Sequence, residues 1–192
     1  LNSADLCLIE RLEELQKAGI SAFKIEGRAK SIYYLANVIG AYRSGIDLLG
    51  DKNISAKNLK IKLNRLLEEL ETKLVHRGYT EGFMFGQGEL AQNLANSHNT
   101  SQWEFCGQIL ENKLSANNKF VNLVKIHNSL KLGDELEILS PPYAIVKLKL
   151  KKMLDAKTGE ELNEAHGGQA KNVLIKTAKP LPKFSVIRRK IN

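Results

Sequence analysis

The spacing of hydrophobic residues changes near residue 102, and this change limits the chain to a mixed architecture. Before that point, hydrophobic residues recur every three or four positions, as on one face of an amphipathic helix. After it, they alternate with polar residues or form short runs between turn residues, as in strands. We therefore expect an α+β fold with two domains, at residues 1–86 and 102–192, joined by a polar linker over residues 87–101.

Three amphipathic helices are predicted before residue 76. The first begins after Ser3, ends at Gly19 and has on one face Leu6, Ile9, Leu12 and Leu15. Ser31 and Ser55 each precede another hydrophobic stripe. A serine in that position caps a helix by accepting a backbone hydrogen bond, so the second and third helices should start directly after these two residues.

One short strand is predicted between the first two helices, at residues 22–25. A single strand cannot form a sheet, and no partner for it is predicted nearby. We therefore expect residues 1 to about 50 to be the helical end of a truncated TIM-like (β/α) barrel. The unpaired edge of such a strand also favours pairing with a second copy of the chain, as a homodimer.

The loop after this strand contains Glu26, Gly27 and Arg28. In a β/α barrel, the loops that follow the strands carry the chemistry. Glycine allows a sharp turn, and Arg28 can bind a carboxylate or phosphate through two parallel hydrogen bonds. The alternative is a surface Glu–Arg pair at a turn, which would have no catalytic role.

A second motif, at residues 76–86, is rich in glycine and aromatic residues. His76 and Arg77 stand close to Tyr79, and together these side chains can recognise an anionic or planar ligand. Alternatively, the aromatic residues anchor the following linker onto the barrel. Both interpretations fit the residue types.

Six strands are predicted after residue 102, at residues 105–110, 120–126, 136–139, 145–153, 172–176 and 184–188. Turn residues separate them, and no helical pattern lies between them. Six short strands in about ninety residues favour a small closed β-barrel, because closure removes exposed strand edges.

Positive charge is concentrated in this β domain. The chain has a net charge of +8, and residues 101–192 hold 16 basic and 9 acidic side chains, which gives +7 for this part. Lys147, Lys149 and Lys151 alternate with leucines and should lie about 7 Å apart on one face, close to the phosphate spacing of a nucleic acid. Arg188, Arg189 and Lys190 form a second basic cluster near the end of the chain. The alternative is a solvated lysine-rich edge strand that prevents aggregation, since no aromatic stacking residue accompanies the lysines.

Three separated motifs resemble the C-terminal part of the collagenase-like peptidases of family U32. They lie, in this order, at residues 1–7, 23–31 and 76–83. Residues 118–120 and 132–138 resemble the C-terminal domain of the same family. The resemblance covers nearly the whole chain and implies a TIM-like barrel followed by a small β-barrel.

The resemblance also implies chemistry. Some members of the family are described as proteases or collagenases, and others are oxygen-independent hydroxylases that modify tRNA or ribosomal RNA. These hydroxylases carry an iron–sulfur cluster on cysteines. Carried over by motif, the implied catalytic residues are Glu26, Arg28, His76 and Arg77, and the implied substrate-binding residues include Lys30 and Tyr79. Cys7 stands where some relatives have a cysteine that ligates the cluster.

We therefore expect this chain to be the RNA-docking, C-terminal part of an iron–sulfur-dependent tRNA hydroxylase. The parent protein should be an enzyme, whereas this part should lack a complete active site. The resemblance implies that the other cluster ligands lie upstream, and Cys7 alone cannot hold a cluster, so we expect no cofactor in this part by itself. Cys7 and Cys106 lie far apart in the sequence, which gives no sign of a disulfide framework or a zinc motif. The alternatives are part of a protease acting on a protein substrate, and a protein-docking or oligomerisation module. No run of about 18 to 20 apolar residues occurs, so we expect no membrane contact and a cytoplasmic location.

Overall fold

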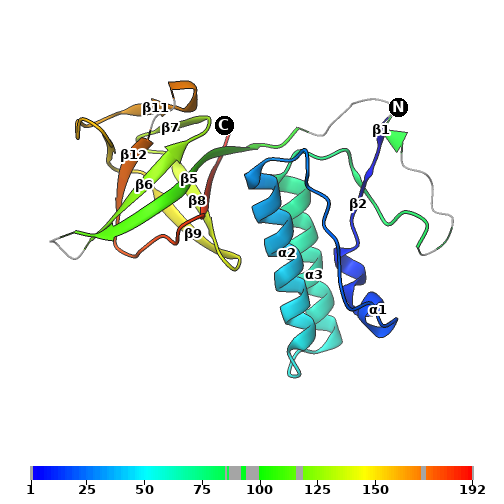
Figure 1. Ribbon diagram of the computed structural model, residues 1–192. Coiled ribbons are helices and arrows are strands. Elements are labelled where there is room, and N and C mark those ends of the chain that lie inside the picture. Colours follow the sequence, from blue (N-terminus) through cyan, green and yellow to red (C-terminus); the bar gives the residue numbers. More distant parts are fainter. Residues whose placement is uncertain are drawn as a thin grey trace. The chain divides into compact units, whose positions relative to one another are not determined.

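The computed structural model describes residues 2–84, 86, 92–93, 100–115, 119–169 and 172–191. The chain divides into two compact units, Leu1–Gln102 and Trp103–Asn192, and each is described by itself (Figure 1). The linker predicted over residues 87–101 lies for the most part outside the described residues.

The first unit contains a short 3₁₀ turn, η1 (Ile9–Arg11), that continues into α1 (Leu12–Lys17), followed by α2 (Ile32–Gly50) and α3 (Ala56–Lys73). Both predicted caps are confirmed. The hydroxyl oxygen of Ser31 accepts a hydrogen bond from the backbone nitrogen of Tyr34 at 3.2 Å, and that of Ser55 accepts one from Asn58 at 3.3 Å. These bonds fix where the two long helices begin.

The helices α2 and α3 lie side by side (Figure 1) and bury their hydrophobic stripes together with α1. Gly45 lets α1 pack closely on α2, because a Cβ atom at this position would lie 2.6 Å from the side chain of Leu12. The Tyr33 hydroxyl also donates to the backbone oxygen of Lys73 at 2.9 Å. The buried residues of this core include Ile9, Leu12, Leu15, Val38, Ala41, Leu59, Leu63, Leu70 and Leu74.

The start of the first helix was predicted too early. Residues 2–6 instead form two short strands, β1 (Asn2–Ser3) and β2 (Asp5–Leu6), and the side chain of Leu6 is exposed. Strand β2 pairs in parallel with β3 (Tyr79–Thr80), and β1 pairs with β4 (Gln92–Asn93). The backbone nitrogens of Asp5 and Cys7 donate to the backbone oxygens of Gly78 and Thr80, at 2.8 and 2.9 Å. These long-range bonds, which the local pattern does not reveal, override the helical spacing.

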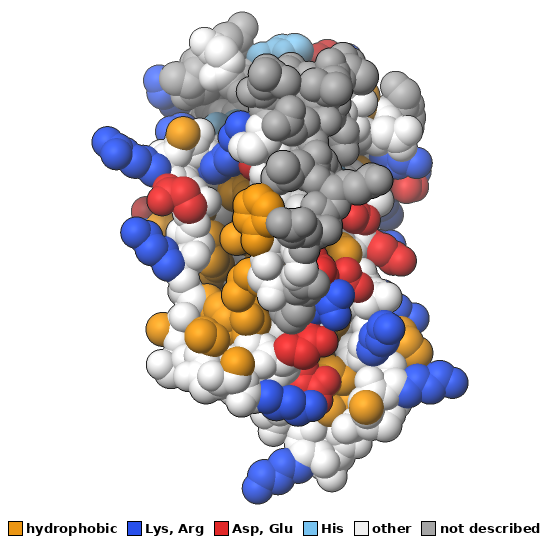
Figure 2. Space-filling model, turned by 90° about the vertical axis from the view of Figure 1, so that its right-hand side faces the viewer, with side chains coloured by type: hydrophobic (Ala, Val, Ile, Leu, Met, Phe, Trp, Pro, Cys, Tyr) orange, Lys and Arg blue, Asp and Glu red, His pale blue; other side chains and the backbone are white. Residues whose placement is uncertain are grey.

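The strand predicted at residues 22–25 is also wrong, because residues 20–27 have no regular secondary structure. Part of this segment borders an apolar hollow of about 450 Å³, lined by residues that include Leu12, Ile20, Phe23, Ile39, Tyr42 and Ile46. Figure 2 shows hydrophobic side chains gathered in a hollow on the face that it presents. An exposed apolar surface of this kind is typical of a face that packs against another part of a protein.

The second unit is a curled, mostly antiparallel sheet (Figure 1). Its strands are β5 (Trp103–Leu114), β6 (Phe120–Ile126), β7 (Ser129–Lys131), β8 (Glu135–Ser140), β9 (Ala144–Lys149), β10 (Met153–Asp155), β11 (Glu164–His166), β12 (Asn172–Thr177) and β13 (Val186–Lys190). Seven of them form one sheet in the order β10-β12-β6-β5-β13-β8-β9, and β7 pairs with β11. The α+β fold with a small barrel-like C-terminal domain is thus confirmed.

The core of this second unit alternates along the strands, as the sequence predicted, and includes Cys106, Ile109, Val124, Ile126, Leu136, Ile138, Val173, Ile175 and Ile187. One predicted strand, at residues 145–153, is divided in two. The backbone groups of Leu150 bond to Gly133 and Asp134 instead of continuing the ladder, at 2.7 and 2.9 Å. Lys151 therefore lies outside β9. None of the helices in the described part of the chain has the length and apolar character needed to span a bilayer.

Candidate functional site

Several predicted site residues of the first unit meet at the paired strands β2 and β3. The carboxylate of Asp5 lies 3.6 Å from the Arg77 Nε atom and 3.8 Å from the Lys30 ammonium group. The Asp5 side chain is only 17% exposed, so these charges interact in partial shelter from water. Asp5 was not predicted as a site residue, although it lies in the first of the three motifs. Its position next to Arg77 follows from the pairing of β2 with β3, which the sequence does not show.

His76 directly precedes Arg77 and is buried. We call Asp5, Lys30, His76, Arg77 and Tyr79 the polar cluster of this unit. Its ring stacks on the ring of Tyr79, with centroids 4.3 Å apart and planes 8° apart. The backbone nitrogen of Gly78 donates to Nδ1 at 3.0 Å, so Nε2 carries the proton and donates to the backbone oxygen of Glu71 at 3.1 Å. Both ring nitrogens are thus held by backbone groups, and the His76 ring supports Tyr79 by stacking on it.

Two buried polar atoms of the cluster lack a hydrogen-bond partner among the described residues: the Tyr79 hydroxyl and the Arg77 Nε atom. Burial also raises the pKa of Tyr79, so the hydroxyl keeps its proton. Buried polar atoms are normally bonded, and each of these two is a donor. The Arg77 Nε atom faces the Asp5 carboxylate at 3.6 Å, so the Tyr79 hydroxyl is the group of this cluster that can donate a hydrogen bond to a ligand.

Glu26 and Arg28 bond to each other rather than to this cluster. The carboxylate of Glu26 accepts a hydrogen bond from the backbone nitrogen of Arg28 at 2.9 Å, and both side chains are exposed. This bond closes the turn before α2. Lys30, at the end of the same loop, lies with its ammonium group 4.8 Å from the centre of the Tyr34 ring. The catalytic roles of Glu26 and Arg28 remain predictions.

Cys7 was predicted to ligate an iron–sulfur cluster. Its sulfur accepts a hydrogen bond from the Tyr42 hydroxyl at 3.8 Å, and burial raises its pKa, which disfavours the thiolate that binds metals. Across the described residues, no group of three or more His, Cys, Asp or Glu side chains could hold a metal ion. The other cysteine, Cys106, belongs to the second unit. The described residues therefore do not fit an iron–sulfur cluster on their own.

The second unit carries its candidate site on one face of four neighbouring strands. Lys147 and Lys149 on β9 stand opposite Glu137 and Glu135 on β8. Lys190, the last residue of β13, lies opposite Trp103, the first residue of β5. Together these residues line a shallow groove of about 240 Å³, and the strand segments between them, at Leu136 and Leu148, also border it.

Trp103 corrects the prediction that no aromatic residue accompanies the lysines. It is distant from Lys147 and Lys149 in the sequence, so no local pattern could have placed it there. The strand order β5-β13-β8-β9 brings it into the same groove. The groove and the arginine behind it contain four basic and two acidic side chains, which leaves an excess of two positive charges.

Arg188 was predicted to contact RNA, but its side chain is 0% exposed. Its Nε and Nη2 atoms donate to the carboxylate of Glu137 at 2.9 and 2.7 Å, and its guanidinium lies 5.2 Å from the centre of the Trp103 ring. Arg188 therefore cannot reach a ligand at the surface. It instead neutralises Glu137 and supports Trp103 from one side.

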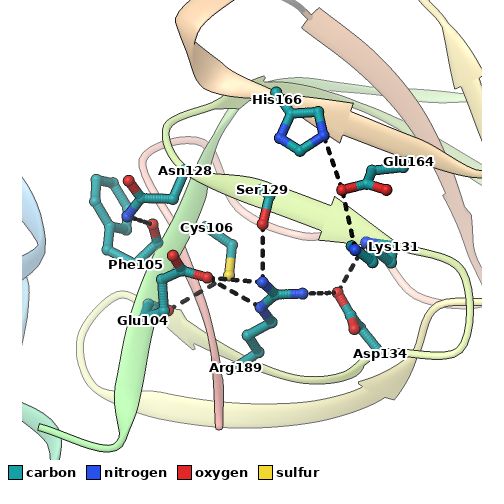
Figure 3. Close-up of polar contacts among 10 residues, drawn as sticks. All are labelled: Glu104, Phe105, Cys106, Asn128, Ser129, Lys131, Asp134, Glu164, His166 and Arg189. Atoms are coloured by element: carbon teal, nitrogen blue, oxygen red, sulfur yellow. Dashed lines mark hydrogen bonds and ion pairs between the residues drawn. The ribbon is translucent and has the colours of Figure 1, made fainter. Parts of the chain in front are cut away.

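Arg189 directly follows Arg188 on β13, so alternation along the strand places its side chain on the opposite face. There it forms a separate polar network (Figure 3). Its guanidinium donates to Glu104 at 2.9 and 3.1 Å, and to Asp134 and Ser129 at 2.8 Å each. Its side chain is only 17% exposed. Three strands and the turn before β8 are joined by these bonds, so Arg189 supports the fold and is a poor candidate for the predicted RNA contact. Nearby, the carboxylate of Glu164 pairs with Lys131 and His166, at 3.2 and 2.8 Å.

The structure thus defines a two-unit α+β chain with a sheltered polar cluster in the helical unit and a basic groove in the β unit. The family model for peptidase family U32 matches residues 1–93, and that for the peptidase family U32 C-terminal domain matches residues 101–188. The chain belongs to peptidase family U32, as the motifs predicted.

Three similar proteins illustrate the family. The tRNA hydroxylation protein P of Escherichia coli is 35% identical over 87% of this chain and 34% of its own length. A collagenase of Porphyromonas gingivalis is 25% identical over 80% of this chain and 41% of its own length. The crystal structure of a U32 peptidase C-terminal domain from Geobacillus thermoleovorans has 28% identity and a TM-score of 0.39, over 46% of this chain and 93% of that one. The chain spans about a third of the length of the curated relatives it matches.

Proposed function

We propose that this chain is the C-terminal part of a tRNA-modifying enzyme, and that its β unit docks the tRNA. The observation that carries the proposal is the groove in which Lys147, Lys149 and Lys190 converge. Relatives named tRNA hydroxylation protein P support tRNA as the substrate. The relatives also make hydroxylation the favoured modification, with the catalytic centre built together with other parts of the enzyme.

The glutamates opposite the lysines do not cancel this site. Glu137 is bound by the buried Arg188, and the Lys147 ammonium lies 3.9 Å away from it with its side chain 82% exposed. Ion pairs between exposed groups are worth about 0–1 kcal/mol, so a phosphate can compete for the lysine. Lys149 and Lys190 are likewise exposed. Lysines two positions apart on a strand lie about 7 Å apart, which suits successive phosphates of an RNA backbone.

Salt-dependent tRNA binding by the full chain tests this proposal. Replacing Lys147, Lys149 and Lys190 by alanine should weaken binding and lower the slope of log affinity against log salt by about 3, because three phosphates are no longer neutralised. Lys113→Ala is the matched control, because Lys113 is also a strand lysine, is 81% exposed and lies 3.8 Å from a glutamate, Glu111. An unchanged slope in the triple variant, or no tRNA binding at low salt, would refute the docking role.

The collagenase-like name of one relative raises peptidase activity as a second function. The predicted catalytic His76 does not favour it, since both of its ring nitrogens are engaged by backbone groups. Incubation of the full chain with gelatin tests this function directly. Cleavage that survives purification and is lost in His76→Gln would establish a peptidase and overturn the present preference.

A further inference from the structure

A buried ion pair supports the tryptophan ring of the basic groove. Trp103 is the single tryptophan of the chain. The guanidinium of Arg188 lies over its ring, and the carboxylate of Glu137 holds that guanidinium. A cation on one side of an aromatic ring attracts its π electrons and fixes the ring in place. Trp103 is therefore positioned before any ligand arrives.

Resting on the proposed docking of tRNA, we propose that the groove is a subsite for an unpaired nucleotide whose base stacks on Trp103. Lys147 and Lys149 then bind the phosphates of the same strand, and Lys190, paired with Trp103 across β13 and β5, adds a third positive charge next to the ring. A positively charged groove combined with an aromatic ring is the arrangement by which proteins hold single-stranded nucleic acid.

The geometry also predicts which RNA cannot stack on Trp103. In an RNA duplex the bases are stacked on each other, so their faces are not available to a side chain. A duplex can reach the lysines but not stack on Trp103. The groove should therefore prefer unpaired segments, such as the loops of a folded tRNA, over duplex RNA of the same charge.

The fluorescence of Trp103 measures this stacking, because no other tryptophan contributes to the signal. We expect a short oligouridylate to quench the fluorescence of the full chain in a saturable way, and a blunt RNA duplex to bind without this quenching. Trp103→Ala should weaken oligouridylate binding, measured by anisotropy of a labelled RNA, by about 5-fold to 150-fold and leave duplex binding nearly unchanged. Trp103→Phe, which keeps an aromatic ring over Arg188, should show a smaller loss.

A matched control is available in Phe184, which is 63% exposed and has the Lys183 ammonium 5.1 Å from its ring centre, but does not line the groove. Phe184→Ala should bind both RNAs as the wild type does. Equal quenching by duplex and oligouridylate, or wild-type affinity in both Trp103 variants, would overturn the stacking subsite while leaving docking intact. Failure of both RNAs to bind at low salt would overturn the proposed function itself.

Discussion

Replacing Arg188 by alanine should destabilise the second unit by about 3–5 kcal/mol, the range for removing one partner of a buried ion pair. Arg188 and Glu137 form such a buried ion pair. The Arg188 side chain is 0% exposed and Glu137 is 13% exposed, with two hydrogen bonds of 2.7 and 2.9 Å between them. The variant would remove the buried charge that faces the Glu137 carboxylate and the cation over the Trp103 ring, and both losses are destabilising.

Lys147→Ala is the matched comparison, because Lys147 approaches the same Glu137 carboxylate from the solvent side. At 3.9 Å and 82% exposure, this pair should contribute no more than about 1 kcal/mol. Each variant removes one partner of the Glu137 carboxylate: Arg188 is the buried partner and Lys147 the exposed one. Their difference in stability isolates the effect of burial.

Urea unfolding of the full chain measures both free energies, with Trp103 fluorescence reporting on the second unit and far-UV circular dichroism as a probe independent of the ring's surroundings. A double variant, Arg188→Met with Glu137→Leu, should recover most of the stability, since an apolar pair of similar volume replaces the buried charges. A destabilisation below about 1 kcal/mol in Arg188→Ala, equal to that of Lys147→Ala, would show that Arg188 is a surface residue and refute its burial.

Three further changes test the packing and titration of the second unit. Gly167→Ala should lower the free energy of unfolding by about 2–3 kcal/mol or more, because its Cβ would lie 1.8 Å from the backbone oxygen of His127, whereas Gly168→Ala meets no atom within 4 Å and should stay within about 0.5 kcal/mol; equal urea midpoints would contradict this packing. Burial, with the charge of Lys125, lowers the pKa of His127 below its ordinary 6.5, so the unfolded state binds the proton better. Stability should therefore fall as pH drops from about 6.5 through the lowered value, and His127→Gln should reduce this fall; an identical pH profile would contradict the assignment. Burial raises the pKa of Cys106 to about 12, so its thiol should resist alkylation in the folded chain near neutral pH and react after unfolding in urea, as counted by mass spectrometry; rapid labelling of the folded chain would contradict its burial.

Local signals predicted the elements of the fold well. Ser31 and Ser55 mark helix starts because a cap depends on a hydrogen bond only three residues away. The strands of the second unit follow from alternation along each strand, which is also local. By contrast, Leu6 fits the spacing of a helix but belongs to a strand that pairs with residues near position 79. Pairing between distant segments is not visible in the spacing of either one.

The candidate sites were predicted less completely, for the same reason. The motifs singled out both Lys30 and Arg77, but the local sequence did not show that the carboxylate of Asp5 on β2 lies between them. Arg188 and Arg189 are adjacent and equally charged, yet alternation along β13 sends them to opposite faces with different partners. Whether an arginine is buried depends on carboxylates on neighbouring strands, which composition does not show.

Strand β9 stands at one end of the strand order, so its lysines fit two explanations that the structure separates. Lysines that only prevent edge-to-edge pairing would serve on either face of an edge strand, because their effect comes from charge beside the open backbone. Lys147 and Lys149 instead share a face with Trp103 and Lys190, across three intervening pairings of strands. The protection of an edge does not require an aromatic ring held in place by a buried arginine. RNA binding makes use of both the lysines and the aromatic ring. This cross-strand arrangement, more than the number of lysines, favours the docking function.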